Sequence, residues 1–243
     1  MPYNQSTPLI LSFEASANHA SSAVYANDCL VAMQQAESRF GHAAGLVSLA
    51  VNVLKESGID FMDLTHVAAG RGPGSFTGIR VALAAAKGVC LAHNLPSIGV
   101  SGMEAVTFSY AQAKNISPIL SLADTRRGNV YAQSFTTNMM QQSKIFETQI
   151  DQLPFLVPPS ICIDGLVLLG YGSSEAEEAF AAQGIKTTKP EIYGDSGCGT
   201  FLVDAGMIAK LAAHQIMRDV FSPLTPLYLA DARLGPKKKK HVK

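Results

Sequence analysis

The fold of this chain is decided by the stretch Gly70–Arg80, which reads GRGPGSFTGIR. A β-prone run at 65–69 precedes it, and the small-residue pattern after it predicts a helix over 76–92. A strand that leads through a glycine turn into a helix leaves backbone N–H groups pointing outward at the helix N-terminus, which favours an anion there. Ser75 is the expected N-cap of that helix, and the glycines permit backbone angles that a Cβ forbids.

The same stretch does not match the common phosphate-binding loops. A Walker loop ends in Gly-Lys-Ser/Thr, whereas Gly78 is followed here by Ile79 and Arg80. A dinucleotide-binding loop has its third glycine where this chain has Ser75. The spacing leaves two interpretations open: an anion site of another kind, or a tight turn whose glycines only let the helix pack close to the sheet.

Four segments of the sequence resemble the bacterial TsaB (YeaZ) family, an accessory component in the synthesis of threonylcarbamoyladenosine in tRNA. The most specific of them is 72–80, GPGSFTGIR. The other three are 9–16 (LILSFEAS), 99–101 (GVS) and 123–131 (ADTRRGNVY). The resemblance covers most of the chain and weakens after about Phe146.

The resemblance implies a non-catalytic scaffold that binds the catalytic subunit TsaD, together with the ATPase TsaE. It also implies a homodimer when TsaD is absent. No cofactor of its own is expected; ATP or ADP is expected only at the assembled complex, and tRNA is expected to be reached indirectly through that complex.

The composition indicates an ordinary globular protein. The chain has 243 residues, of which 47% are hydrophobic, enough for a sizeable core. The sequence shows no signal-peptide pattern, and its apolar runs are interrupted before about 18 residues, so we expect a cytoplasmic protein that does not enter a membrane. The four cysteines form no C-x-x-C pair, which is typical of reduced thiols.

The formal net charge of zero conceals an uneven distribution. Five of the 19 Lys and Arg residues lie in 237–243, so the first 236 residues carry 14 basic and 19 acidic side chains, a net charge of −5. An acidic body argues against a broad tRNA-binding surface. The basic end predicts a disordered tail, with a diffuse phosphate contact to tRNA as the alternative.

One order of elements is predicted twice along the chain. Strands at 8–13, 21–25 and 29–34, a helix at 41–57, a strand at 65–69, a helix at 76–92 and a strand at 97–100 make the first copy. After a helix at 102–113, strands are predicted at 119–122, 129–135, 144–149 and 166–169, with helices at 174–183 and 199–218.

This repeat predicts an α/β fold of the duplicated actin, sugar kinase and Hsp70 type (ribonuclease H-like), which the resemblance also implies. Two lobes are expected, each with a mixed sheet flanked by helices, and the second lobe is reduced. The predicted boundaries are 1–112 for the N-terminal lobe, 113–236 for the C-terminal lobe and 237–243 for the basic tail. A ligand cleft is expected between the lobes.

Two carboxylates are placed for metal or phosphate chemistry in that cleft. Glu14 ends the first strand and Asp124 ends the first strand of the second half, so they are expected to face each other. The family usually has Asp-Thr where this chain has Glu14-Ala15, which weakens a ligand role for Glu14. A buried, hydrogen-bonded acid with a local structural role is the alternative.

The histidines do not predict a metal site. The related catalytic subunit TsaD, which resembles proteins once grouped as metalloproteases, holds its metal through histidines four residues apart on a helix. No His-x-x-x-His or His-Glu-x-x-His occurs in this sequence. No catalytic residue is assigned. A kinase-like phosphotransferase or a peptidase of the same fold, acting alone, stays the competing function, with a dimeric anion-binding module as a third possibility.

The positive signal points to association between chains. The helices at 41–57 and 76–92 are apolar or small around most of their circumference, which allows another helix to approach closely. Two core helices with no free surface are the alternative. The predicted partner residues are Ala43, Leu46, Val47, Ala50, Ile79, Ala82, Leu83, Ala85, Ala86 and Val89; the predicted anion or nucleotide contacts are Gly72, Gly74, Ser75, Thr77 and Arg80. On this basis Ala85→Arg is expected to prevent partner binding.

Overall fold

The structure, a computed structural model, describes residues 7–17, 19–37, 42–113, 118–136, 141, 143–162, 165–190 and 202–229. For residues 42–44 and 113 only the backbone is described. The basic tail predicted at 237–243 and the first residues of the helix predicted at 199–218 lie outside these ranges.

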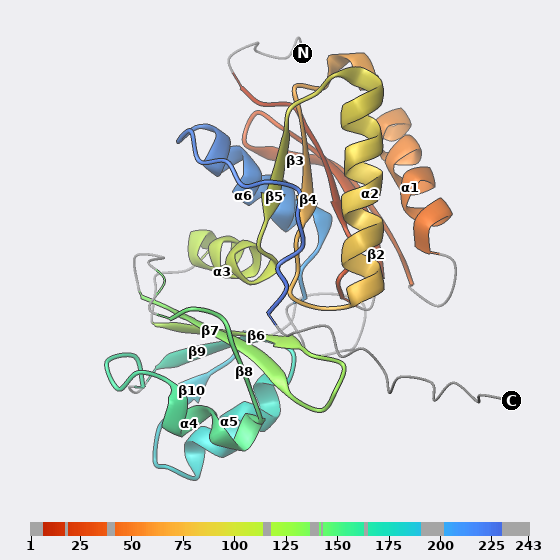
Figure 1. Cartoon of the computed structure of the whole chain (residues 1–243). Coiled ribbons are helices and arrows are strands. Elements are labelled where there is room, and N and C mark those ends of the chain that lie inside the picture. Colours follow the sequence, from red (N-terminus) through yellow and green to blue (C-terminus); the bar gives the residue numbers. More distant parts are fainter. Residues whose placement is uncertain are drawn as a thin grey trace, which may run out of the picture.

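Two five-stranded sheets and six α-helices make up the described chain (Figure 1). The strands are β1 (Ile10–Glu14), β2 (His19–Ala26), β3 (Cys29–Glu37), β4 (His66–Gly70), β5 (Ser97–Val100), β6 (Ile119–Asp124), β7 (Val130–Phe135), β8 (Phe146–Thr148), β9 (Leu166–Gly170) and β10 (Thr187–Thr188). The helices are α1 (His42–Ser57), α2 (Phe76–His93), α3 (Gly102–Ala113), α4 (Leu153–Leu156), α5 (Ser173–Ala181) and α6 (Ala205–Ile216), with short 3₁₀ turns at Phe61–Asp63 and Ile150–Gln152.

The two sheets have the same topology. The first has the order β3-β2-β1-β4-β5, in which β1 is antiparallel to β2 and parallel to β4. The second has the order β8-β7-β6-β9-β10, in which β6 is antiparallel to β7 and parallel to β9. The predicted duplicated fold of the actin type is therefore confirmed.

The second copy is reduced, as the sequence predicted. Its outer strands β8 and β10 have three and two residues, and the four-residue α4 lies where the first copy has the 16-residue α1. The sequence did not predict β10 or α4, because elements this short carry too few residues to show a period.

The central strand β1 is apolar on both faces because helices cover both sides of its sheet. Leu11 and Phe13 pack in the cluster beneath α1 and α2, whereas Ile10 packs in the cluster beneath α3 and α6. Helices α1 and α2 lie side by side along one face, with α6 behind the sheet (Figure 1). A partner that approaches the first sheet from this side therefore meets the outer sides of α1 and α2.

Helix α3 joins the two lobes. Its residues Ala105 and Phe108 pack with the first sheet, and Val106 packs with Ile119 and Phe135 of the second. A helix buried between both sheets restricts the opening of the cleft beside it.

The predicted lobe boundary needs a correction. Helix α6 was assigned to the C-terminal lobe, 113–236, but Ile208 and Ala212 pack against the first sheet. The segment 220–229, called the C-terminal strap below, also returns to the first lobe: the Gly99 N–H donates to the Ser222 carbonyl at 2.8 Å, and Leu224 lies in the core beneath α1 and α2. Sequence periodicity does not show this return, because it identifies a helix without its packing partner.

Candidate functional site

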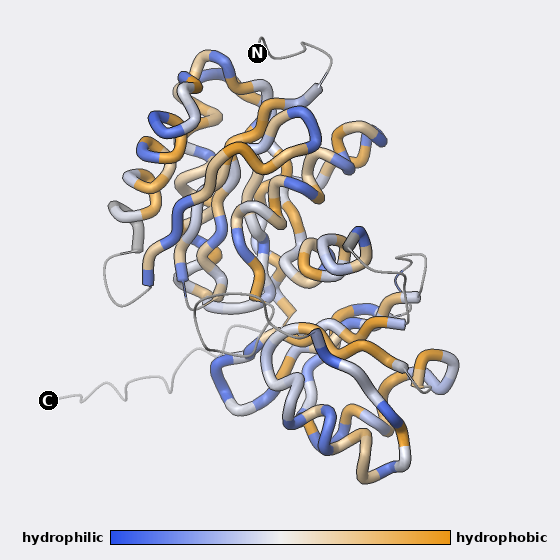
Figure 2. The backbone as a smooth tube through the Cα atoms, turned by 180° about the vertical axis from the view of Figure 1, so that it is seen from behind, coloured by the Kyte–Doolittle hydropathy of each residue, from blue (hydrophilic) through white to orange (hydrophobic). Residues whose placement is uncertain are grey.

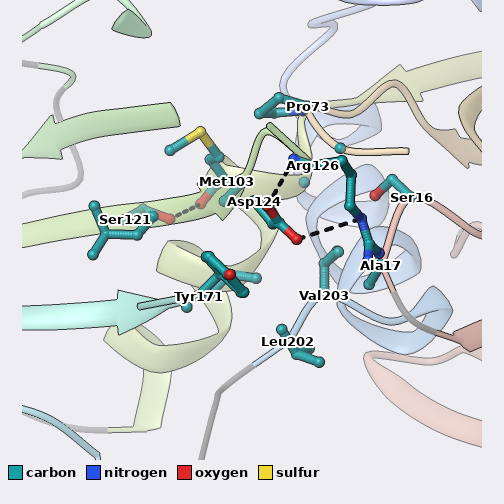
Figure 3. A pocket seen from close by; sticks show the side chains of 16 residues that line it. Ser16, Ala17, Pro73, Met103, Ser121, Asp124, Arg126, Tyr171, Leu202 and Val203 are labelled. Carbon is teal, nitrogen blue, oxygen red and sulfur yellow. Dashed lines mark hydrogen bonds and ion pairs between the residues drawn. The ribbon is translucent and has the colours of Figure 1, made fainter. Parts of the chain in front are cut away.

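A small cavity lies between the two lobes (Figure 3). Ser16, Pro73 and Gly74 line it from the first lobe, and Asp124, Arg126 and Tyr171 from the second. Its volume is about 60 Å³, against about 300–1,000 Å³ for pockets that hold drug-sized ligands and cofactors. The cavity lined by these described residues is small and partly open to solvent.

The two predicted carboxylates do not face each other. Asp124 lines the cavity, but it accepts a hydrogen bond from the Arg126 N–H at 2.7 Å and pairs with the Arg126 Nε at 3.4 Å (Figure 3). Glu14 is fully buried and does not line the cavity; its Oε1 accepts from the Ser16 N–H, and its Oε2 occupies the space that a side chain of Gly70 would fill. The predicted pairing of Glu14 with Asp124 across the cleft is corrected accordingly.

Burial raises the pKa of the Glu14 carboxyl above its ordinary value of 4.5. Hydrogen bonds from Ser16 and Ala15 lower this pKa, but their effect is smaller than that of burial. Nearby Asp204 raises it further, and burial raises the pKa of Asp204 as well. Glu14 Oε2 has no hydrogen-bond partner in the structure. Burial therefore favours the neutral form of this carboxyl.

Replacing Glu14 with glutamine should make the protein relatively more stable as the pH rises. The folded state holds the Glu14 proton more tightly than the unfolded state, so the stability that Glu14 contributes is complete below about pH 4.5 and is lost as the pH rises through its folded pKa. Glutamine stays neutral throughout. Urea unfolding at pH 4.5 and pH 8 measures the free energy of unfolding of both proteins, and the difference between them should change in favour of the variant at the higher pH. A difference that stays constant would mean that the pKa of Glu14 is not raised by folding.

The glycine stretch packs against the turn that follows β1. The Ser75 N–H donates to the Ser16 carbonyl at 2.8 Å, and the Ser75 Oγ accepts from the Gly78 N–H at 3.2 Å as the helix N-cap. A Cβ on Gly78 would overlap the Ala15 carbonyl, and one on Gly74 would come within 2.5 Å of the Ser16 carbonyl. These two N–H groups are engaged by the chain itself, which fits the close-packing interpretation.

The remaining predicted anion contacts differ in their exposure. Gly72 is buried, and its carbonyl accepts from the Gly102 N–H at 2.9 Å. Thr77 and Arg80 are exposed on the first turns of α2. Arg80 lies over the Phe76 ring and donates to the Tyr228 hydroxyl of the C-terminal strap.

The structure divides the ten predicted partner residues by their exposure. Six of them are buried in the core of the first lobe and cannot belong to an outer surface: Leu46, Ala50, Ile79, Ala82, Leu83 and Ala86. Val47 is exposed, Ala85 and Val89 are half-buried, and the side chain of Ala43 lies outside the described residues. The prediction is therefore corrected for the six buried residues.

Other residues of the same helices form the exposed outer surface. We define the α1–α2 face as Val47 and Val51 of α1 and Arg80, Ala84, Gly88 and Leu91 of α2. The exposed fractions are 44% for Val47, 47% for Val51 and 88% for Leu91. A Cβ on Gly88 would meet nothing within 4 Å, so this part of α2 faces open space. In Figure 2 hydrophobic colouring continues along the middle of α1, away from its charged C-terminal end.

Sequence reasoning found these helices and missed which side faces outward. The inner and outer sides of both helices carry small or apolar residues. The 3.6-residue period of apolar residues therefore does not distinguish the buried side from the exposed side. A usable signal was the position of the charged residues, because Arg80 and Lys87 mark the outer side of α2.

Two further observations concern a metal site and a membrane-spanning helix. Among the residues that the structure describes, no three His, Cys, Asp or Glu side chains lie close enough together to hold a metal ion. Helix α2 is, within the described part of the chain, the one helix long and apolar enough to cross a membrane. Here it lies along the first sheet with Ala82 and Ala86 in the core.

Comparison with known proteins links the chain to one group of relatives. The family model described as "TsaD: tRNA N6-adenosine threonylcarbamoyltransferase" matches residues 36–219. The chain is 34% identical over 90 residues to the tRNA threonylcarbamoyladenosine biosynthesis protein TsaB of Escherichia coli (strain K12), which covers 37% of this chain and 39% of that protein. It is 27% identical over 130 residues to the TsaB protein of Buchnera aphidicola subsp. Schizaphis graminum, which covers 54% of this chain and 61% of that protein. The matches thus span less than two thirds of these relatives' own length.

Solved structures extend the likeness over the whole fold. A Pseudomonas aeruginosa protein described as similar to peptidase YeaZ superposes with a TM-score of 0.74 at 19% identity, covering 92% of this chain and 100% of that one. YeaZ from Pseudomonas aeruginosa gives a TM-score of 0.70 at 20% identity, covering 91% and 100%. At these identities the likeness shows the fold alone.

Proposed function

This chain belongs to the TsaB (YeaZ) group of the tRNA N6-adenosine threonylcarbamoyltransferase (TsaD) family, and from that membership we propose that it is a non-catalytic accessory subunit in the synthesis of threonylcarbamoyladenosine in tRNA. It binds a TsaD-like catalytic subunit, which transfers the threonylcarbamoyl group to adenosine, and a TsaE-like ATPase joins the pair. The observation that carries the proposal is the exposed apolar α1–α2 face.

The shape of that face suits a helical partner. Val47 and Val51 lie one turn apart on α1, and Ala84 and Gly88 lie one turn apart on α2. Small residues at this spacing let a second helix approach closely and interdigitate. In the proposed complex the partner's helices lie across these two, and the same face forms a homodimer when the catalytic subunit is absent.

The residues at the interlobe cavity support a role without catalysis. The cavity is small, Glu14 is sealed away from it, and Asp124 is paired with Arg126. We therefore propose that ATP or ADP binds at the assembled complex and not at this chain alone. The chain acts by binding: a partner that prefers the active arrangement of the catalytic subunit increases the population of that arrangement.

Reconstitution with each component left out tests the proposal. The chain is mixed with the TsaD-like and TsaE-like subunits from the same cell, and modified adenosine is measured in tRNA digests. We expect modification to require all of the components, and we expect the chain alone to hydrolyse no ATP with magnesium. Full modification without the chain, or ATP turnover by the chain alone, would contradict the proposal, and turnover would favour the phosphotransferase alternative.

Asp124→Asn separates the accessory role from that alternative. Removing a catalytic carboxylate costs about 100-fold or more in rate. In an accessory subunit Asp124 touches no reacting atom, so the modification rate of the reconstituted complex should change by less than about twofold. A loss near 100-fold, with the variant still folded and bound to its partner, would assign chemistry to this cleft.

A further inference from the structure

The exposed charges of α1 and α2 are mostly positive. Among the described side chains of the two helices, Lys55, Arg80 and Lys87 are exposed cations, and Glu56 is the one exposed carboxylate. Glu56 already accepts a hydrogen bond from Gln34 Nε2 at 3.1 Å. The first 236 residues carry a net charge of −5, so the described exposed charges on α1 and α2 themselves have the opposite sign to that of the body.

Two exposed carboxylates, Asp60 and Asp63, follow the C-terminal end of α1 and keep their negative charge, because their side chains accept only from the backbone N–H groups of Met62 and Asp60. They precede β4, whereas Arg80 follows it, so they lie toward the other end of the helix pair from Arg80. Helix α2 contains no acidic residue along its whole length.

Arg80 is held in place without a carboxylate. Its guanidinium lies 3.8 Å from the centre of the Phe76 ring, and its Nε and Nη2 donate to the Tyr228 hydroxyl at 3.2 and 3.1 Å. By contrast, Arg126 and Arg127 pair with carboxylates at 3.4 and 3.2 Å. Within the part of the chain that the structure describes, no acidic side chain pairs with Arg80, so its charge is available to another molecule.

The contacts behind Tyr228 keep this arginine ordered. The Leu227 N–H donates to the Arg71 carbonyl at 3.0 Å, and Arg71 Nε donates to the Thr225 carbonyl at 2.7 Å. The strap therefore fixes Tyr228 beside α2. An arginine ordered in advance loses less side-chain entropy when it binds an anion.

Arg80 lies on the same side of α2 as the apolar residues of the α1–α2 face. Arg80, Ala84, Gly88 and Leu91 follow one another at spacings of four, four and three residues, which places them along one line of the helix. A helix that docks over Ala84 and Gly88 passes Arg80 at the N-terminal end of the contact.

We propose that the α1–α2 face selects a helical partner that presents acidic residues, with one carboxylate opposite Arg80, and that the same positive charge weakens association with a second copy of this chain. This inference rests on the proposed function, and it adds a physical reason why the chain binds the catalytic subunit in preference to a second copy of itself. In a two-fold dimer the same patch meets itself, so two patches with the same excess of positive charge are brought together. Unlike charges favour the heterologous pair, and like charges oppose the self-pair.

Salt provides the first test, because the two associations respond to it in opposite directions. Self-association is measured by sedimentation equilibrium, and binding to the purified TsaD-like subunit by titration calorimetry, both at low and high sodium chloride. Screening should weaken the heterologous complex by about tenfold or more and should strengthen the homodimer. Salt dependence of the same sign for both would overturn the inference.

Arg80→Glu provides the second test, with Arg218→Glu as the matched control. Arg218 is an exposed arginine that follows α6, on the opposite side of the first sheet. Arg80→Glu should weaken partner binding by about 30-fold or more and tighten the homodimer, whereas Arg218→Glu should change either by less than about threefold. Arg80→Gln, which removes the charge without reversing it, should give an intermediate loss, and thermal unfolding checks that each variant is folded.

The results of these binding experiments distinguish the proposed charge selection from the proposed accessory function on which it rests. If the parent chain binds the TsaD-like subunit and Ala84→Arg prevents binding, while Arg80→Glu weakens it no more than Arg218→Glu, only the charge selection is overturned. If the parent chain does not bind that subunit at all, the proposed function is overturned together with this inference.

Discussion

Ala84→Arg should reduce binding to the TsaD-like subunit by about 100-fold or more while leaving the chain folded. Ala84 is exposed in the middle of the outer side of α2, one turn from Gly88. A partner helix packed closely there has no room for an arginine side chain. In the isolated chain the new side chain extends into solvent, so the free energy of unfolding should change by about 0.5 kcal/mol or less.

The control is the same substitution on the other lobe. Ala181→Arg places an arginine at the exposed end of α5, far from α1 and α2 in the fold, and should leave partner affinity unchanged. Ala85→Arg, the variant chosen from the sequence, is a poorer test because Ala85 is half-buried against the core. Equal affinities of Ala84→Arg and Ala181→Arg for the partner would exclude the α1–α2 face as the binding surface.

Two glycine-to-alanine changes on α2 should alter stability in opposite directions. A Cβ on Gly78 would overlap the Ala15 carbonyl, so Gly78→Ala must displace either α2 or the turn after β1, at a cost of about 3 kcal/mol. Gly88 has open space around it, and alanine in a helix interior is favoured over glycine. Gly88→Ala should therefore stabilise the chain by about 0.5–1 kcal/mol.

Urea unfolding of the two variants measures both effects under the same conditions. The pair is informative because the chemical change and the helix are the same, and only the surroundings differ. A mild effect at Gly78 would mean that α2 does not dock against the turn after β1. For Gly88→Ala we also expect weaker partner binding, since the added methyl group stands where the partner helix packs; a tighter complex would place the contact elsewhere.

The duplicated fold could be predicted because two runs of the sequence carry the same order of strands and helices. Strands such as Leu166–Gly170 and helices such as Phe76–His93 are long enough to show their period. The packing of α6 on the first lobe could not be predicted in this way, because a periodic apolar side does not identify the sheet that it covers.

The candidate site was predicted less well, for two physical reasons. Helices α1 and α2 are apolar or small on their inner and outer sides, so Leu46 and Val47 look alike in the sequence although one is core and the other surface. At the glycine stretch, spacing alone does not distinguish an anion from the Ser16 carbonyl as the group that meets the Ser75 N–H. Which helix side is buried, and which group accepts from the Ser75 N–H, both depend on contacts between residues that are distant in the sequence.

Amide hydrogen exchange of the chain, alone and with the TsaD-like subunit, reports directly whether α1 and α2 form the binding surface. Exchange should slow on binding in residues 45–57 and 80–92, and it should stay the same in α5 and in the strands of the second sheet. Protection confined to the interlobe cavity or the second lobe, with no change in α1 and α2, would contradict a scaffold that binds through this face.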